Sequence, residues 1–260
     1  TAYCETCAAI ANALWNHRMF LLHGDGKYMD IFERTVYNGF LSGISLEGNS
    51  YFYPNPLAAD GIYKFNHSDI KRQPWFGCSC CPTNVVRFIP SIPGFAYACK
   101  GDQIYRNLYF TGEARIHTPQ GVITVAQKSD YPWDGRIDLT ITPETEKAFE
   151  IRLRIPEWAQ GKPLPSDLYT YLNPESDPVT LLVNGESTPL TLDKGYAVLP
   201  RSWKAGDRIA LNLPMPIRRV LSHEAIAENR GKVALERGPI VFCAEGVDNQ
   251  IGRASCRERV

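Results

Sequence analysis

The sequence lacks an excess of charge of either sign, because 28 Lys and Arg residues balance 28 Asp and Glu residues. Without a net positive field, the chain has no global attraction to nucleic acid or to an anionic membrane. It also lacks any apolar run near the roughly 20 residues that cross a bilayer, and its start lacks the basic flank of a signal peptide. These absences favour a neutral small-molecule or oligosaccharide substrate over nucleic-acid or membrane partners. They leave the oligomeric state open.

Low-complexity segments and internal repeats are missing as well. The content of 44% hydrophobic and 22% charged residues is ordinary for a globular protein, which excludes disorder, collagen and a coiled coil. A chain of 260 residues is long for one compact domain, so we expect two cores. The patterns predict an α+β chain, with helices over residues 1–97 and strands over 98–250.

The first part carries the spacing of helices. Apolar residues and alanines recur over residues 5–22, and Gly24 then ends that helix. Asp25 is a candidate cap for a second helix that runs to about Ser42. A third helix is expected to follow Pro82, since proline suits a first helical turn. Three such helices suggest part of a helical array.

Beyond residue 98 the sequence alternates in short runs with a two-residue period, which predicts strands. Gly, Pro, Asn and Asp separate the runs, and no helical pattern lies between them, so the region 98–250 is expected to form an antiparallel β-sandwich. The runs are QIYRNLYF, GVITVAQ, RIDLTIT, FEIRLRI, VTLLVNG, YAVLP, RIALNLP and KVALERGPIVFCAEG.

Both ends of the sequence are unusual. The chain opens on Thr1 rather than Met and enters a helical pattern almost at once. The segment IGRASCRERV at residues 251–260 breaks from the strand-like pattern before it. We therefore expect a fragment of a longer protein and a tail that is not native sequence.

The eight cysteines are unevenly placed, with several of them at the start of the first helix and in the segment GCSCCPTN. Cys80 and Cys81 are adjacent, which is poor geometry for a mutual disulfide but suits metal ligation. Zinc takes thiolate and carboxylate ligands, usually four. The alternative is that buried cysteines serve as small apolar residues and that an acidic residue favours a helix start. The candidate ligands are Glu5, Cys7, Cys80 and Cys81.

Four segments together resemble the β-L-arabinofuranosidases of glycoside hydrolase family 127. They are AYCETCAAIANALWN, YFYPNPL, RQPWFGCSCCPTNVVRFIPSIPGFAYA and ALERGPIVFCAEG, and the resemblance runs to about Asp248. It implies an (α/α)₆ barrel followed by β-sandwich domains, with only the last barrel helices present here. It also implies one Zn²⁺ ion, held by Glu5, Cys7, Cys80 and Cys81.

The same resemblance implies a retaining exo-glycosidase that acts on terminal β-L-arabinofuranosides or a related sugar. Cys80 would be its nucleophile, in place of the usual second carboxylate. A neighbouring metal keeps a thiol in its reactive thiolate form. The general acid/base would be a glutamate upstream of Thr1, so we expect this chain alone to be inactive.

Other residues near these segments are further candidates for the site. Tyr53 matches a tyrosine that lies near the sugar in the family, and its hydroxyl could also bond the thiolate, although a half-buried strand aromatic is the alternative. Trp75 and Phe76 could face a sugar or pack in a core. The remaining expectations are that Asn84 and Arg87 orient the cluster, that His17 and His23 are structural, that Cys4 and Cys78 pack around the site, and that Cys99 and Cys243 are core strand residues.

Two other functional classes remain open on the residues alone. The first is a zinc-stabilised carbohydrate-binding or structural module, since a closed four-ligand shell is typical of structural zinc. The second is a thiol redox protein, which the missing βαβ pattern after CETC disfavours. Access to Cys80 separates catalysis from a sealed structural site. Reduced thiolates favour the cytoplasm, but a metal can protect cysteines elsewhere, so the compartment stays open.

Overall fold

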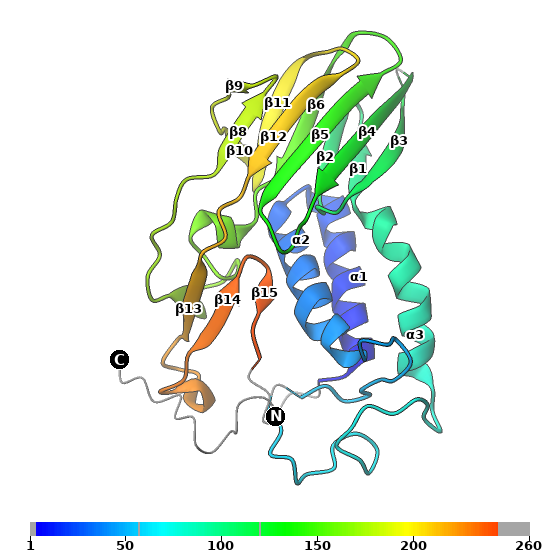
Figure 1. Ribbon diagram of the computed structural model, residues 1–260, viewed down its shortest axis with the longest axis vertical. Coiled ribbons are helices and arrows are strands. Elements are labelled where there is room, and N and C mark those ends of the chain that lie inside the picture. Colours follow the sequence, from blue (N-terminus) through cyan, green and yellow to red (C-terminus); the bar gives the residue numbers. More distant parts are fainter. Residues whose placement is uncertain (1–3, 57, 120, 244–260) are drawn as a thin grey trace.

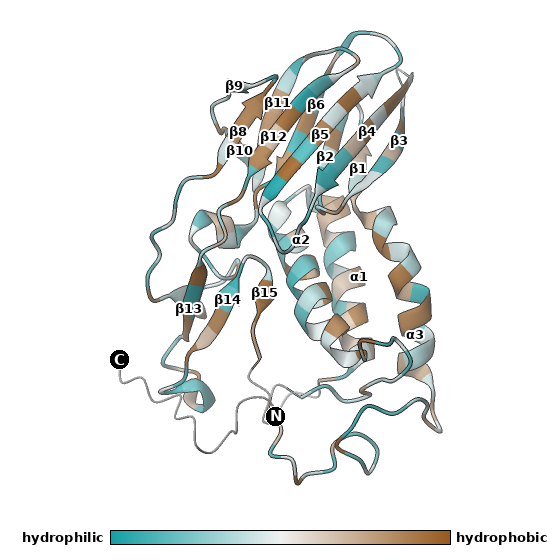
Figure 2. Ribbon diagram, viewed as in Figure 1, coloured by the Kyte–Doolittle hydropathy of each residue, from teal (hydrophilic) through white to brown (hydrophobic). Residues whose placement is uncertain are grey.

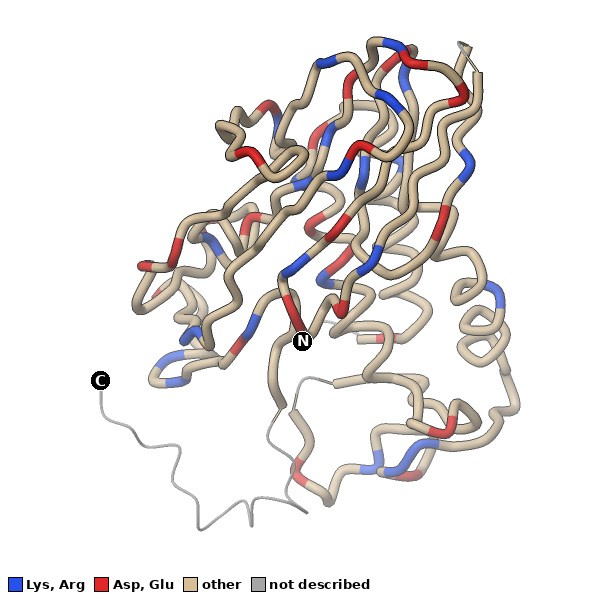
Figure 3. Tube along the Cα trace, turned by 45° about the horizontal axis from the view of Figure 1, so that its top comes forward, with Lys and Arg blue, Asp and Glu red and all other residues tan. Residues whose placement is uncertain are grey.

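The computed structural model describes residues 4–56, 58–119 and 121–243. Three helices lie against one end of a β-sandwich, and a smaller sheet lies beside them (Figure 1). Positive and negative residues are interspersed along the trace rather than gathered by sign (Figure 3). No helix in the described part is both long and apolar enough to cross a membrane. The predicted non-native tail, residues 251–260, lies outside the described residues.

The first helix, α1 at Thr6–His23, matches the predicted range. It ends because Gly24 adopts a left-handed conformation, with φ 62°, and its N–H donates to the carbonyl of Phe20. Asp25 then caps α2, Gly26–Arg34, by accepting from the N–H of Lys27 at 3.1 Å. The sequence signals for this turn between two helices are therefore confirmed.

The ends of the other two predicted helices differ from expectation. Beyond α2 the chain continues as a π-helical turn, Thr35–Phe40, and a 3₁₀ turn, Leu41–Gly43. The third helix, α3 at Cys80–Phe88, starts two residues before Pro82 rather than after it, and a 3₁₀ segment, Ile89–Phe95, follows. Proline fits inside the first turn because the N–H groups there have no intrahelical acceptor. Consequently Cys80 and Cys81 are the first residues of α3.

The β-sandwich has two sheets, with strand orders β1-β2-β6-β11-β10 and β3-β4-β5-β12-β8-β9. Apolar and polar residues alternate along its strands (Figure 2), and the apolar faces meet in one core around the fully buried Trp203. The strands of the first sheet are β1 Tyr97–Lys100, β2 Gln103–Arg106, β6 Lys147–Arg154, β10 Leu192–Asp193 and β11 Tyr196–Trp203. Those of the second are β3 Gly112–Thr118, β4 Gly121–Ser129, β5 Arg136–Pro143, β8 Thr180–Val183, β9 Glu186–Ser187 and β12 Asp207–Asn212.

One pair of strands departs from the antiparallel expectation. Strands β2 and β6 run parallel, with Ile104 opposite Ile151. The chain leaves β2, builds β3, β4 and β5 in the facing sheet, and returns as β6, so the two neighbours point the same way. Residues 107–110, which we predicted to extend β2, are an irregular segment in which Leu108 and Tyr109 are buried.

A third, smaller sheet has the order β15-β14-β13-β7 and lies next to α2 (Figure 1). Its attachment is polar, because Arg34 of α2 pairs with Glu236 of β14 at 2.7 Å. Gly238, with φ 56°, breaks the last predicted strand into two. The strands are β7 Tyr169–Tyr171, β13 Ile217–Ser222, β14 Ala234–Arg237 and β15 Ile240–Val241.

The helices join the sandwich through a buried ionic cluster. The side chain of Arg154, at the end of β6, is 0% exposed and lies 2.5 Å from both Asp30 and Glu33 of α2. The Tyr131 hydroxyl also donates to Glu33, at 2.7 Å. Since the described residues include only three α-helices, the (α/α)₆ barrel remains a prediction.

Candidate metal and thiol site

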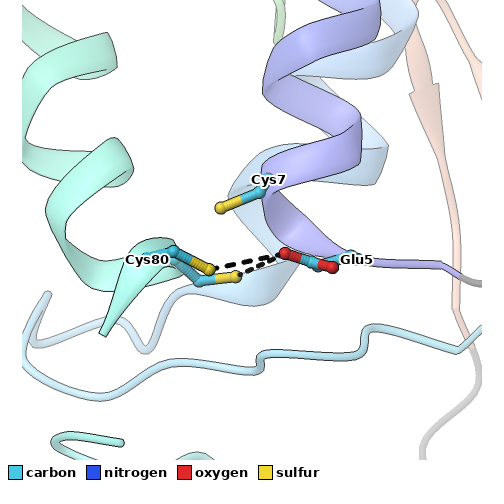
Figure 4. Close-up of side chains that lie close together, drawn as sticks. Glu5, Cys7 and Cys80 are labelled. Carbon is cyan, nitrogen blue, oxygen red and sulfur yellow. Dashed lines mark hydrogen bonds between the residues drawn. The ribbon is translucent and has the colours of Figure 1, made fainter. Parts of the chain in front are cut away.

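Four potential ligand atoms meet where α1 and α3 begin. One carboxylate oxygen of Glu5 and the Sγ atoms of Cys7, Cys80 and Cys81 all lie within 4.8 Å of one another. Figure 4 shows the side chains from the two helices pointing toward one another. Oε1 of Glu5 is 3.6 Å from each sulfur of the adjacent pair. The structure thus brings together the four residues that the sequence singles out, in an arrangement that could hold a metal ion.

The local backbone explains how these residues come to face one another. Glu5 is the extended N-cap residue of α1, and Thr6 donates its N–H to the carbonyl of Tyr53 at 3.1 Å. The Thr6 hydroxyl, fully buried, donates to the carbonyl of Phe52 at 2.7 Å. Gly43 packs against this hydroxyl, and the contact is possible because glycine has no Cβ: a Cβ there would lie 2.6 Å from the hydroxyl oxygen. Both helices therefore direct their N-terminal turns, which favour negative charge, at one point.

The three cluster thiols differ in exposure. Cys81 is fully buried, whereas Cys7 and Cys80 are half-buried. Burial raises the pKa of the Cys81 thiol, and burial likewise raises the pKa of Cys7 against the effect of a hydrogen bond from Asn84. These thiols therefore need a nearby positive charge to ionise at neutral pH. Cys80 is the more accessible member of the adjacent pair.

Asn84 and Arg87 follow the pair on α3 and were both predicted to orient the cluster. Nδ2 of Asn84 donates to Sγ of Cys7 across the two helices at 3.1 Å. Arg87 is exposed. Of the two, Asn84 is the residue that contacts the cluster.

Tyr53 lies directly against Cys80. Its Oη is 2.7 Å from Sγ of Cys80 and 3.9 Å from Sγ of Cys78. Hydrogen bonding with Cys80 raises the pKa of the Tyr53 hydroxyl, so this group stays protonated at neutral pH and can donate to a thiolate. Its ring packs edge-on against buried Phe76, with centroids 5.4 Å apart. Trp75 is 61% exposed and remains a candidate surface for a sugar.

His67 lies at the site but was missed from the sequence. Its ring centroid is 4.6 Å from that of Tyr53, and it is exposed. His67 and Ser68 both adopt left-handed backbone conformations, with φ 49° and 73°. Two consecutive residues of this kind are unusual outside glycine and cluster at functional sites. The turn-forming run NHSD between the two aromatic motifs is the signal that could have marked this loop.

Asn66 anchors that loop from the inside. It is 0% exposed, and its Oδ1 accepts from the N–H of Tyr53 at 2.8 Å. Its Nδ2 donates to the carbonyl of Lys71 at 2.8 Å. One buried amide therefore fixes the loop and the tyrosine segment to each other.

The remaining assignments have mixed outcomes. The ring centroid of His17 lies 4.6 Å from that of Phe95, a packing contact that fits the expected structural role. His23 stacks on Tyr28 at 5.6 Å. The expectation that Cys99 and Cys243 belong to the core is wrong, because both are exposed. In a short edge strand such as β1, the alternation of apolar and polar residues in the sequence does not show which face is buried.

Comparison with protein families decides the broad identity. Three models of the β-L-arabinofuranosidase family match in order along the chain: the catalytic domain over residues 1–94, the middle domain over 103–215 and the C-terminal domain over 217–259. The chain belongs to glycoside hydrolase family 127. It is also 34% identical to a non-reducing end β-L-arabinofuranosidase of Bifidobacterium longum subsp. longum, over 96% of this chain and 36% of that protein.

Solved structures of family 127 agree with the fold. A family 127 β-arabinofuranosidase superposes with a TM-score of 0.89 at 48% identity, covering 96% of this chain and 38% of the other. A β-L-arabinofuranosidase from Geobacillus stearothermophilus T6 gives 0.84 at 39% identity, covering 95% and 37%. The chain thus spans slightly more than a third of the length of these family 127 relatives.

Proposed function

We propose that the chain carries the zinc-thiolate part of a retaining exo-glycosidase that hydrolyses terminal β-L-arabinofuranosides or a related sugar. The observation that carries the proposal is the convergence of the Glu5 carboxylate with three cysteine sulfurs, one of which, Cys80, is still accessible. The family 127 relatives named as β-L-arabinofuranosidases supply the reaction class.

The donor set and its spacing suit zinc. Bonds of about 2.3 Å to sulfur and about 2.1 Å to oxygen, at a tetrahedral angle, place the two ligand atoms about 3.6 Å apart. Oε1 of Glu5 is 3.6 Å from Sγ of Cys80 and from Sγ of Cys81. When bound, Zn²⁺ supplies the positive charge that keeps these cysteines as thiolates.

The residues of the chain would have separate roles in the reaction. Glu5, Cys7, Cys80 and Cys81 would hold the ion, and the Cys80 sulfur would attack the anomeric carbon of the sugar. The Cys80 thiol donates to the Tyr53 hydroxyl at 2.7 Å, and once Cys80 is ionised the same hydroxyl would donate to the thiolate and hold it in position. A general acid outside this chain protonates the leaving oxygen and later activates the water that releases the sugar. Retention of configuration follows from two successive displacements at one carbon.

The alternative is a zinc-stabilised structural or carbohydrate-binding module. In its favour, four protein ligands form the closed shell that structural zinc normally has. Against it, the cysteines of a purely structural site are expected to be closed to solvent. Here Cys81 is fully buried, but Cys80 is only half-buried and lies near the exposed Cys78.

Elemental analysis of the purified chain tests the metal assignment. We expect about one zinc per chain, as a four-ligand site holds one ion, and clear loss in Cys80→Ser and Cys81→Ser. Cys99→Ser is the matched control, because it changes an exposed cysteine outside the cluster. Correctly folded wild-type chain without zinc would count against the proposal. For catalysis, Cys80→Ser in the full-length enzyme should abolish release of arabinose.

A further inference from the structure

A further thiol lies next to the sulfur that the proposed function makes reactive. The Tyr53 hydroxyl is 2.7 Å from Sγ of Cys80 and 3.9 Å from Sγ of Cys78, so both sulfurs border the same oxygen. Cys78 is exposed and is not one of the four residues of the metal cluster. The site therefore holds one cysteine more than the metal shell uses.

The backbone permits a bond between these two sulfurs. Residues two apart in the chain are separated by at most about 7 Å between Cα atoms, and disulfides need about 4.4 to 6.8 Å. Ser79, between them, has φ −93° and ψ 30°, which bends the chain and shortens that separation. Cys78 also precedes α3, so its side chain can move without disturbing a helix.

The other cluster cysteines are less suited to pair with Cys80. Cys81 is its direct neighbour and is fully buried at the start of α3. Cys7 belongs to α1 and accepts a hydrogen bond from Asn84 at 3.1 Å. Among the cysteines beside Cys80, Cys78 combines proximity to the Tyr53 hydroxyl, exposure and a position outside the helix.

We propose that Cys78 is the resolving cysteine of Cys80: a peroxide oxidises the pair to a disulfide, which removes Cys80 from the metal shell and reversibly inactivates the site. The inference rests on the proposed function, because it takes Cys80 to be the accessible metal-bound sulfur. Its benefit is protection, since a sulfenic acid without a nearby thiol proceeds to irreversible sulfinic acid.

The chemistry balances with hydrogen peroxide as the oxidant. The Cys80 thiolate attacks one peroxide oxygen, the O–O bond breaks, and hydroxide leaves and takes up a proton to become water. The Cys78 sulfur then attacks the sulfur of the Cys80 sulfenic acid. The S–O bond breaks, a second water leaves with the proton of Cys78, and the S–S bond forms. A dithiol reductant returns both thiols and restores the ligand.

The test follows metal and mass together on the zinc-loaded chain. Stoichiometric hydrogen peroxide should release zinc, detected with a chromophoric chelator, and lower the intact mass by about 2 Da for one disulfide. Trypsin places Cys78, Cys80 and Cys81 in the peptide 73–87, apart from Cys4 and Cys7. After alkylation of free thiols, fragmentation of that peptide should find label on Cys81 and a bond between Cys78 and Cys80.

Cys78→Ser separates this role from plain oxidation. The variant should bind as much zinc as wild type before treatment. Because sulfinic acid consumes two equivalents of peroxide, two equivalents should add about 32 Da, and the variant should then fail to recover zinc binding after dithiothreitol. Wild type and Cys99→Ser, which removes another exposed cysteine, should recover it. A bond from Cys80 to Cys81 or Cys4, or full recovery in Cys78→Ser, would overturn the proposal.

The two proposals fail in different ways. If the wild-type chain binds no zinc, the proposed function fails before any oxidant is added. If it binds zinc but peroxide yields only sulfinic acid at Cys80, the metal site stands and the resolving role of Cys78 is wrong.

Discussion

Asn84 shows what a single residue contributes around the cluster. Its amide donates to Sγ of Cys7 at 3.1 Å and so fixes the one cysteine of the cluster that belongs to α1. Hydrogen bonds of this kind orient ligands, and their loss typically weakens metal binding about 10- to 100-fold. We expect Asn84→Ala to lower zinc affinity by that factor in competition with a chromophoric chelator. Arg87→Ala, an exposed change on the same helix, is the control, and equal affinities would contradict the role of Asn84.

Asp30 makes the stability of the chain depend on pH. Burial raises its pKa to about 7 from 3.8, against the opposing effect of the Arg154 guanidinium, and the neighbouring charge of Glu33 adds to the rise. Between these values the folded chain holds a proton that the unfolded chain has lost, so this contribution to the free energy of unfolding is present at low pH and is lost as pH rises to about 7.

Asp30→Asn should remove that dependence. Relative to wild type, the free energy of unfolding of the variant should rise between pH 5 and pH 8 by about 2.7 kcal/mol, since about two pKa units of the shift fall in that interval and one unit is worth about 1.4 kcal/mol. Urea denaturation at the two pH values under reducing conditions measures the difference. Asp138→Asn, on the exposed face of β5, should show no such trend. A constant difference for Asp30→Asn would refute the assignment.

At the scale of elements, Arg154 joins α2 to the sandwich. Its side chain is 0% exposed, and removing it leaves two buried carboxylates without a counter-charge. We expect Arg154→Ala to lower the free energy of unfolding by about 3 to 5 kcal/mol in chemical denaturation. Arg136→Ala breaks an ion pair whose arginine side chain is 76% exposed and should lower it by less than about 1 kcal/mol. Equal effects would show that the buried cluster does not bind the two parts together.

The elements also show where sequence reasoning succeeds. Local sequence signals predicted the helices. Gly24 and Asp25 define the turn between α1 and α2, and both form hydrogen bonds with backbone atoms a few residues away. The parallel pairing of β2 with β6 and the burial of Arg154 depend on contacts across long stretches of chain, which a period of two residues does not encode. The cysteine cluster was predictable because residue type and motif single out its four members. His67 was not, because its approach to Tyr53 depends on how one buried amide folds a loop.

At the scale of the whole chain, the proposed metal site would tie α1 to α3, since its four residues lie at the starts of these two helices. A ligand that binds only the folded state stabilises it by about 4 kcal/mol at a thousandfold excess over its dissociation constant. Stripping zinc with a chelator should therefore lower the melting temperature of the wild-type chain, and restoring zinc should recover it. Cys81→Ser should show neither change. A melting temperature that is insensitive to chelator in zinc-loaded wild type would mean that the ion adds no link between the helices.

Retaining hydrolysis needs a nucleophile and an acid/base, yet among the described residues the carboxylate in contact with Cys80 is that of Glu5, which the proposal assigns to zinc. The chain also spans only 36% of its Bifidobacterium relative, and α1 leaves Trp15 and Leu22 66% and 73% exposed. Such a surface suits helices that would complete a sugar pocket.

We therefore expect the zinc-loaded chain to release no arabinose from a terminal β-L-arabinofuranoside, with the full-length Bifidobacterium enzyme as the positive control. Release above the blank would place the acid/base inside this chain, and the search for it would then turn to the loop around His67.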